Sequence, residues 1–312
     1  MKLSIVSTLY KSAATVEGFV ERATQAANAI TDDFELILVD DGSPDDALEI
    51  AIGLLDRYPA LKIVELSRNF GHHKALMTGL DHSVGDYVFL IDSDLEEAPE
   101  LLTEFWAELE ARRADVIYGY QASRNGGWTG RAAGGIAYWA FSQLIPHGIP
   151  QNHLTVRLMR RAYVDSLVAH REREVVIGGL WVITGYRQVG LPVEKRIKQG
   201  TSYSLKRRWR LLLDSITSFS EAPLVAIFYV GMLISAVAGV VGMVILIRFL
   251  IGGVGVDGWV SVMLSVWFLG GLAIFFIGII GLYLSKIFIE TKNRPYTIVR
   301  AVHEAAGGQA RS

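Results

Sequence analysis

The chain has 312 residues and a formal net charge of −2, from 30 basic and 32 acidic side chains. This balance excludes the overall basic field of a nucleic-acid-binding protein. The absence of cysteine excludes disulfides and thiolate metal sites. Hydrophobic residues make up 51% of the chain, and their excess lies in two segments near the C-terminus.

Residues 1–120 alternate between short apolar segments and longer amphipathic ones. The expected strands are Leu3–Ser7, Glu35–Val39, Lys62–Leu66 and Tyr87–Ile91. The expected helices are Thr15–Ala29, Asp45–Tyr58 and His73–Ser83. The strands are almost continuously apolar, as strands covered on both faces are. The alternation predicts an α/β domain with a mostly parallel, Rossmann-like sheet and helices on both faces.

Two acidic turns follow the second and fourth expected strands. Asp40–Ser43 reads D-D-G-S, and Asp92–Asp94 reads D-S-D. Parallel sheets bind ligands at the carboxyl ends of their strands, so both turns are expected in one crevice. Two carboxylates there form a hard oxygen site that suits Mg²⁺ or Mn²⁺ and leaves positions for phosphate oxygens. Plain surface acids are the alternative reading of a D-x-D pattern.

A glycine-rich stretch follows Tyr120, and a different sequence pattern begins at residue 203. Residues 203–222 carry a basic cluster followed by apolar residues, which predicts an amphipathic helix in the lipid headgroup layer. A solvated helix is the alternative. Leu224–Ile247 and Gly258–Ser285 then contain no charged residue, and each exceeds the roughly 20 residues that a helix needs to cross a bilayer.

These two segments predict a transmembrane hairpin over residues 223–251 and 258–285. Basic residues flank its outer ends: Lys206, Arg207, Arg208, Arg210, Lys286, Lys292, Arg294 and Arg300. The connector side offers only Arg248. By the positive-inside rule, the domain formed by residues 1–202, the tail formed by residues 286–312 and both termini are expected in the cytoplasm.

Several stretches resemble the polyprenyl-phosphate glycosyltransferases: LVDDGSPD, LSRNFGHHKALMTGLDHSVGD, LIDSDLEEAPE and SITSFSEAPL. These enzymes have a GT-A fold of family 2 and are similar to dolichyl-phosphate mannose synthase; many are bactoprenol glucosyltransferases with a two-helix anchor. The likeness covers nearly the whole chain. It implies an inverting transferase of the bacterial inner (plasma) membrane. That enzyme moves a sugar, expected to be glucose from a UDP-linked nucleotide sugar, to undecaprenyl phosphate for cell-surface glycan modification. The resemblance also implies a homo-oligomer, in this family often a tetramer.

The resemblance assigns roles to individual residues. The donor-binding set is Thr8, Tyr10, Asp41, Asp92 and Ser93. The metal ligands are Asp92, Asp94 and Glu96. The acceptor phosphate is expected to bind Arg124, Arg131 and Lys198. Catalysis is assigned to Asp92 and Asp94, through the metal, and to Arg124 and Arg131.

Three positions depart from the family's pattern. At the end of the first strand the family usually reads V-Y-N-E, whereas here Tyr10 is followed by Lys11 and Ser12. This difference alters the expected base pocket, so the identity of the nucleotide stays open. Glu96 stands where the family has glutamine, and Thr155 stands where it has an acid sometimes proposed as catalytic. A lipid phosphate has a second pKa of about 6 and is largely dianionic at pH 7, so it needs positioning rather than a base.

Other functions fit the sequence less well. A processive polysaccharide synthase would carry more spans and a Q-x-x-R-W motif, and Trp209 lacks the glutamine. A dinucleotide-dependent oxidoreductase would have G-x-G-x-x-G after the first strand, where the chain reads Ser7–Tyr10. A non-catalytic membrane scaffold and transfer of another hexose or an amino sugar remain alternatives. No chemistry is assigned to His72 or His73, which precede or cap a helix.

Overall fold

The computed structural model describes residues 1–121, 153–173, 175–193, 222–252 and 258–305. The chain divides into two compact units. The first comprises Met1–Tyr138, His147–Tyr203 and Arg294–Ser312 and contains the described sheet; the second comprises Trp139–Pro146 and Ser204–Asn293 and contains two long helices.

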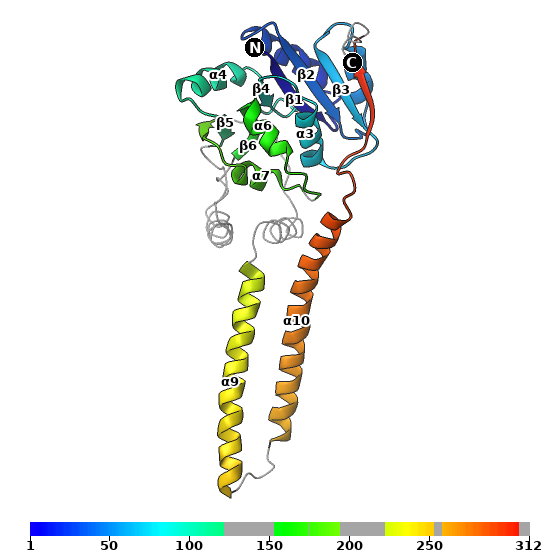
Figure 1. Ribbon diagram of the computed structural model, residues 1–312. Helices are drawn as coiled ribbons and strands as arrows, with labels where there is room; N and C mark the ends of the chain where they lie inside the picture. Colours follow the sequence, from blue (N-terminus) through cyan, green and yellow to red (C-terminus); the bar gives the residue numbers. More distant parts are fainter. Residues whose placement is uncertain (122–152, 174, 194–221, 253–257, 306–312) are drawn as a thin grey trace, which may run out of the picture. The chain divides into compact units, whose positions relative to one another are not determined.

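The first unit is an α/β domain (Figure 1). Its strands are β1 (Leu3–Leu9), β2 (Phe34–Asp40), β3 (Leu61–Leu66), β4 (Tyr87–Leu90), β5 (Val116–Tyr120), β6 (His153–Arg160), β7 (Gln188–Pro192) and β8 (Val299–Glu304). Its helices are α1 (Val16–Asn28), α2 (Ala47–Gly53), α3 (His72–Asp81), α4 (Leu101–Ala111), α6 (Arg161–Val168) and α7 (Ile177–Ile183). The four expected strands and three expected helices are present; α2 is shorter than expected, because the chain turns tightly from Leu54 to Tyr58.

The strands form a single sheet in the order β7-β5-β6-β4-β1-β2-β3-β8. The central strands β4, β1, β2 and β3 run parallel, as βαβ connections require. β6 runs antiparallel to both of its neighbours, β4 and β5. The expectation of a mostly parallel sheet is confirmed, with β6 and β8 as its antiparallel members.

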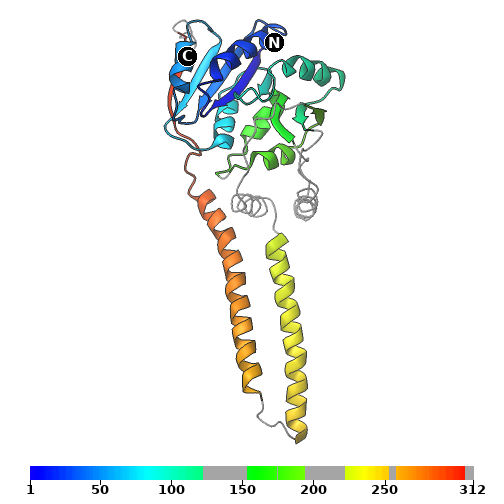
Figure 2. The same cartoon turned by 180° about the vertical axis from the view of Figure 1, so that it is seen from behind.

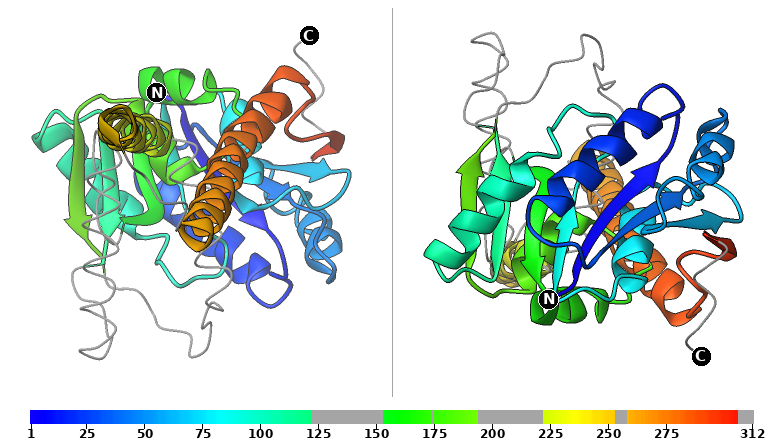
Figure 3. Two further views of the ribbon diagram at one scale, coloured as in Figure 1. Left: turned by 90° about the horizontal axis from the view of Figure 1, so that it is seen from below. Right: turned by 90° about the horizontal axis from the view of Figure 1, so that it is seen from above.

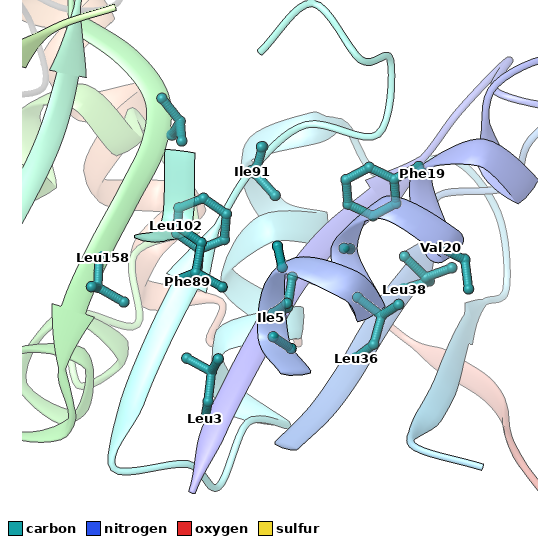
Figure 4. Packing of buried hydrophobic residues seen from close by; sticks show 14 of the residues in the cluster. Leu3, Ile5, Phe19, Val20, Leu36, Leu38, Phe89, Ile91, Leu102 and Leu158 are labelled. Carbon is teal, nitrogen blue, oxygen red and sulfur yellow. The ribbon is translucent and has the colours of Figure 1, made fainter. Parts of the chain in front are cut away.

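Each face of the sheet carries its own apolar core. Alternate residues of a strand point to opposite faces, so Ile5 joins one cluster and Val6 joins the other. The first cluster packs beneath α1 and α4 (Figure 3). Phe105 and Phe19 are both fully buried in it, and Phe19 is labelled in Figure 4. The second packs beneath α3, α6 and α7. The domain is therefore covered on both faces and holds its strand ends in a fixed arrangement.

The last strand of the sheet comes from a segment that the sequence analysis assigned to a cytoplasmic tail. Val299–Glu304 form β8, which pairs antiparallel with β3 at the edge of the sheet (Figure 2). Ser67 donates its backbone N–H to the carbonyl of Ile298 at 2.9 Å, and the hydroxyls of Thr78 and Thr297 lie 2.8 Å apart. Residues from about 297 to 304 are therefore part of the α/β domain.

The second unit contains α9 (Ala222–Gly252) and α10 (Trp259–Thr291), which contact each other. Both helices expose large apolar side chains, among them Phe228, Leu233, Phe268 and Ile274. In the part of the chain that the structure describes, one stretch is long and apolar enough to cross a membrane: Phe268–Thr291, with a mean hydropathy of 2.3.

Candidate functional site

The carboxyl ends of β1, β2 and β4 are joined by direct hydrogen bonds. Asp41, which follows β2, donates its backbone N–H to the carbonyl of Leu9 at 3.1 Å. Ser93, which follows β4, donates its hydroxyl to the carbonyl of Thr8 at 2.7 Å. Both acidic turns are therefore fixed to the end of the central strand, and they lie together at this edge of the sheet, as the topology predicts.

The side chain of Asp41 organises the turn that leads into α3. One carboxylate oxygen accepts the backbone N–H of Phe70 at 2.7 Å, and the other accepts that of Gly71 at 3.0 Å. Burial raises the pKa of Asp41, which is 2% exposed, while these two hydrogen bonds oppose the rise. The sequence analysis missed this structural use. The contact of Asp41 with a nucleotide base stays a prediction.

The turn after Asp41 depends on glycine. Gly42 has a φ of +61°, and a Cβ atom at this position would lie 2.6 Å from the backbone nitrogen of Asn69. The next residue, Ser43, accepts the backbone N–H of Lys11 at 2.8 Å, and Lys11 also has a positive φ, of 57°. The loop after β1 is thus held against the loop after β2. Tyr10, which is predicted to bind the nucleotide sugar, is 48% exposed in this loop.

The D-S-D turn presents two carboxylates at the end of β4. Asp94 accepts the backbone N–H of Glu96 at 3.0 Å, and Leu95 between them has a φ of 59°, in the left-handed region. This conformation is unfavourable for a non-glycine residue and is found in tight turns at functional sites. The buried Ser93 faces β1, while Asp92 and Asp94 stay partly accessible to solvent.

The carboxylate oxygens of this turn are suitable ligands for a divalent cation. Two carboxylates suit Mg²⁺ or Mn²⁺, and diphosphate oxygens and water can complete an octahedral shell. Among the described residues, no three His, Asp or Glu side chains are gathered closely enough to hold a metal ion by themselves. The part predicted for Glu96 therefore gains no geometric support and stays a prediction, as does the metal role of Asp92 and Asp94.

His72 joins this site, although no chemistry was assigned to it from the sequence. It is the first residue of α3, and its Nδ1 lies 3.2 Å from the hydroxyl of Thr8. Its Nε2 lies 3.4 Å from Oδ1 of Asp92. The only available signal was its position at the start of a helix that follows a strand.

A buried arginine lies on the side of the site formed by β6. Arg157 is 1% exposed, pairs in register with Leu90 of β4, and stacks on Trp181 of α7 with 3.0 Å between the guanidinium carbon and the ring centre. Burial lowers the pKa of Arg157 to about 9. The guanidinium donates to the backbone carbonyls of Leu154 and Thr155. This strand brings Thr155, the position of the missing acid, to the same edge of the sheet as the D-S-D turn.

The predicted acceptor-binding residues Arg124, Arg131 and Lys198 lie outside the described residues, as does the expected interfacial helix of residues 203–222. Of the predicted site residues, the structure therefore describes only those predicted to bind the nucleotide sugar or the metal. Among these, Thr8, Asp41, Asp92 and Ser93 are brought together by hydrogen bonds and close contacts through β1 and α3.

Comparison with known proteins gives a consistent result along the chain. Residues 4–168 match the family model described as glycosyl transferase family 2. A Mycobacterium tuberculosis protein described as "putative glycosyltransferases" is 51% identical over 304 residues, which cover 97% of this chain and 89% of that protein. The prophage bactoprenol glucosyl transferase homolog of Escherichia coli K12 is 30% identical, over 97% of this chain and 99% of the relative.

A solved structure shares the fold of the α/β domain. The glucosyl-3-phosphoglycerate synthase of M. tuberculosis aligns with a TM-score of 0.50 over 70% of this chain and 80% of that one, at 18% sequence identity. At this identity the likeness concerns the fold alone.

Proposed function

This chain belongs to glycosyl transferase family 2, and from that premise we propose that it transfers a sugar from a nucleotide sugar to a polyprenyl phosphate at the cytoplasmic face of a membrane. The observation that carries the proposal is a mostly parallel sheet at whose edge two acidic turns meet, combined with two long apolar helices in the same chain. The relative named as a bactoprenol glucosyl transferase homolog aligns over almost its whole length, so the likeness includes both parts.

The position of β8 supports a two-helix anchor. β8 follows α10 in the chain, yet it pairs with β3, which precedes α9. Strands of one sheet must lie on one side of a membrane, because a sheet edge inside lipid would leave its backbone groups without partners. If the chain between β3 and β8 enters a membrane, it must therefore cross it an even number of times. Two crossings, by α9 and α10, satisfy this condition, and a single crossing does not.

The proposed reaction needs a positioned acceptor more than a base. An oxygen of the lipid phosphate attacks the anomeric carbon of the sugar, the bond from that carbon to the nucleotide diphosphate breaks, and the configuration inverts. The phosphate is largely dianionic at pH 7, so no proton must be removed. This agrees with Thr155 at the position where relatives of the resembled family carry an acid.

The residues at the crevice divide the remaining work. Asp92 and Asp94 would hold a divalent cation, which supplies positive charge to the departing diphosphate. Thr8, Asp41 and the exposed ring of Tyr10 line the side at which the nucleotide would bind. Acceptor binding is assigned to Arg124, Arg131 and Lys198, whose guanidinium and ammonium groups suit phosphate oxygens.

A donor screen tests the proposal. The purified full-length chain, in nanodiscs with undecaprenyl phosphate, is incubated with labelled UDP-glucose, UDP-galactose, UDP-N-acetylglucosamine and GDP-mannose. We expect a lipid-extractable labelled product from one donor, its loss in EDTA, and a rate at least about 10²-fold lower for Asp94→Asn. Asp56→Asn, at an exposed position on the same domain, serves as the matched control and should retain the wild-type rate.

Two results would contradict the proposal. If no donor gave a lipid-linked product, polyprenyl phosphate would be excluded as the acceptor. Formation of a long water-soluble polymer would move the chain to the processive synthases. Full activity in EDTA would be consistent with the transfer reaction but would exclude a divalent cation as a requirement for it.

A further inference from the structure

His72 connects two strand ends that carry donor-site residues. Its imidazole lies between the hydroxyl of Thr8, the penultimate residue of β1, and the carboxylate of Asp92, which follows β4. The side chain of His72 is 46% exposed and that of Asp92 is 23% exposed, so both side chains are partly accessible to solvent. The next residue, His73, has a different environment: its Nδ1 lies 3.1 Å from the carbonyl oxygen of Val175.

The two partners of His72 select one tautomer of the neutral ring. Nε2 faces a carboxylate oxygen, which only accepts hydrogen bonds, so the proton belongs on Nε2. Nδ1 then accepts the hydroxyl proton of Thr8 at 3.2 Å.

The placement of His72 does not depend on the helix alone. The preceding residues Phe70 and Gly71 are bound to both carboxylate oxygens of Asp41, and the amide of Asn69 donates to the carbonyl of Asp41 at 3.0 Å. The start of α3 is thereby fixed to the end of β2. The backbone before His72 is fixed to the end of β2 through Asp41. The imidazole itself contacts Thr8 of β1 and Asp92 in the turn after β4.

We propose that His72 is a positioning residue of the donor site, which restricts the carboxylate of Asp92 to one orientation and so sets the affinity of the site for a divalent cation bound with a nucleoside diphosphate. The inference rests on the proposed function, because it assumes that Asp92 is a metal ligand. Partners that orient a ligating side chain are worth about 10–100-fold in metal affinity or activity. His72 has the geometry of such a partner, and His73 does not.

The test measures binding of Mn²⁺ rather than turnover. The probe is Mn²⁺ with UDP added to the purified full-length chain, and free Mn²⁺ is followed by electron paramagnetic resonance. We expect His72→Ala to weaken Mn²⁺ binding by about 10–100-fold. His72→Gln, which keeps an N–H donor at a similar distance from the backbone, should recover part of this loss. His73→Ala is the matched control and should bind Mn²⁺ as the wild type does.

A kinetic measurement separates positioning from general damage to the fold. With His72→Ala, the Mn²⁺ concentration that gives half-maximal rate should rise, while kcat at saturating Mn²⁺ recovers toward the wild-type value. A variant that is merely misfolded would lose kcat at every Mn²⁺ concentration. His72→Gln provides the same comparison if the alanine variant has a reduced Tm.

The outcomes distinguish this inference from the function on which it rests. Wild-type affinity for Mn²⁺ in both His72 variants would overturn the positioning role and leave the proposed function intact. An equal loss in His73→Ala would also overturn it, because the effect would then belong to the helix as a whole. A wild-type chain that binds no Mn²⁺ with UDP would overturn both the inference and the metal part of the proposed function.

Discussion

Asp41 illustrates how a buried carboxylate can organise a binding site through the backbone. Its two oxygens accept the N–H groups of Phe70 and Gly71, which precede α3 and would otherwise lack partners at the start of that helix. Gly71 has a φ of +102°, a conformation that L side chains rarely adopt. The turn is therefore built from a glycine that permits the conformation and a carboxylate that stabilises it.

Replacing Asp41 by asparagine tests this use of the side chain. The new amide group would direct its N–H toward a backbone N–H that now donates to the carboxylate, and an unsatisfied buried donor costs about 1–3 kcal/mol. We expect Asp41→Asn to lower the Tm of the detergent-solubilised protein by several degrees. The exposed Asp56→Asn should leave Tm unchanged. An unaltered Tm in Asp41→Asn would mean that the turn before α3 is held by other contacts.

The strand β8 closes one edge of the sheet with a segment from the C-terminal region. An unpaired edge strand exposes backbone groups that favour association with other chains. β8 covers β3, and ion pairs lie across the two strands: Lys62 with Glu304 at 3.0 Å, and Glu65 with Arg300 at 3.2 Å. Nε2 of His303 is also within hydrogen-bond distance of Glu65, at 2.9 Å. Exposed ion pairs contribute little to stability, so the pairing of the backbone is the larger effect.

Truncation tests whether β8 is an integral strand. Removal of residues 294–312 should lower the Tm of the domain and promote aggregation, because the edge of β3 becomes exposed. Removal of residues 306–312 leaves β8 intact and should change neither property. The measurements are thermal unfolding and size-exclusion chromatography in detergent. A long truncation that is as stable and as monodisperse as the wild type would show that β8 adds nothing to the fold.

The arrangement of the chain around the membrane follows from basic residues and from the sheet together. Basic side chains cluster before α9 and after α10, and by the positive-inside rule they predict that those ends lie in the cytoplasm. For the proposed anchor, the pairing of β8 with β3 requires the segments before α9 and after α10 to lie on the same side. The proposed acceptor, a lipid phosphate, is confined to the headgroup layer, so an anchored catalytic domain increases the local concentration of enzyme at its substrate.

Cysteine labelling tests this topology directly. The chain has no cysteine, so a single introduced thiol reports its own position. Val254→Cys, in the connector between the helices, should react with a membrane-impermeant maleimide in intact cells. Ser312→Cys should react only after the cells are permeabilised. The reverse pattern would place the catalytic domain outside the cell and exclude a cytoplasmic nucleotide sugar as its donor.

The central strands, the helices between them and the acidic turns could be predicted from the sequence, because each depends on residues close together in the chain. The apolar runs that became β1 to β4 and the carboxylates of the D-S-D turn are local patterns. The roles of Asp41, His72 and β8 could not be predicted in this way. Thr8 and His72 are 64 positions apart, and β8 pairs with a strand more than two hundred residues before it. A local pattern records which face of a segment is apolar, but a carboxylate used for a distant backbone N–H, an imidazole between two strand ends and a partner for a sheet edge exist only after folding has brought those segments together.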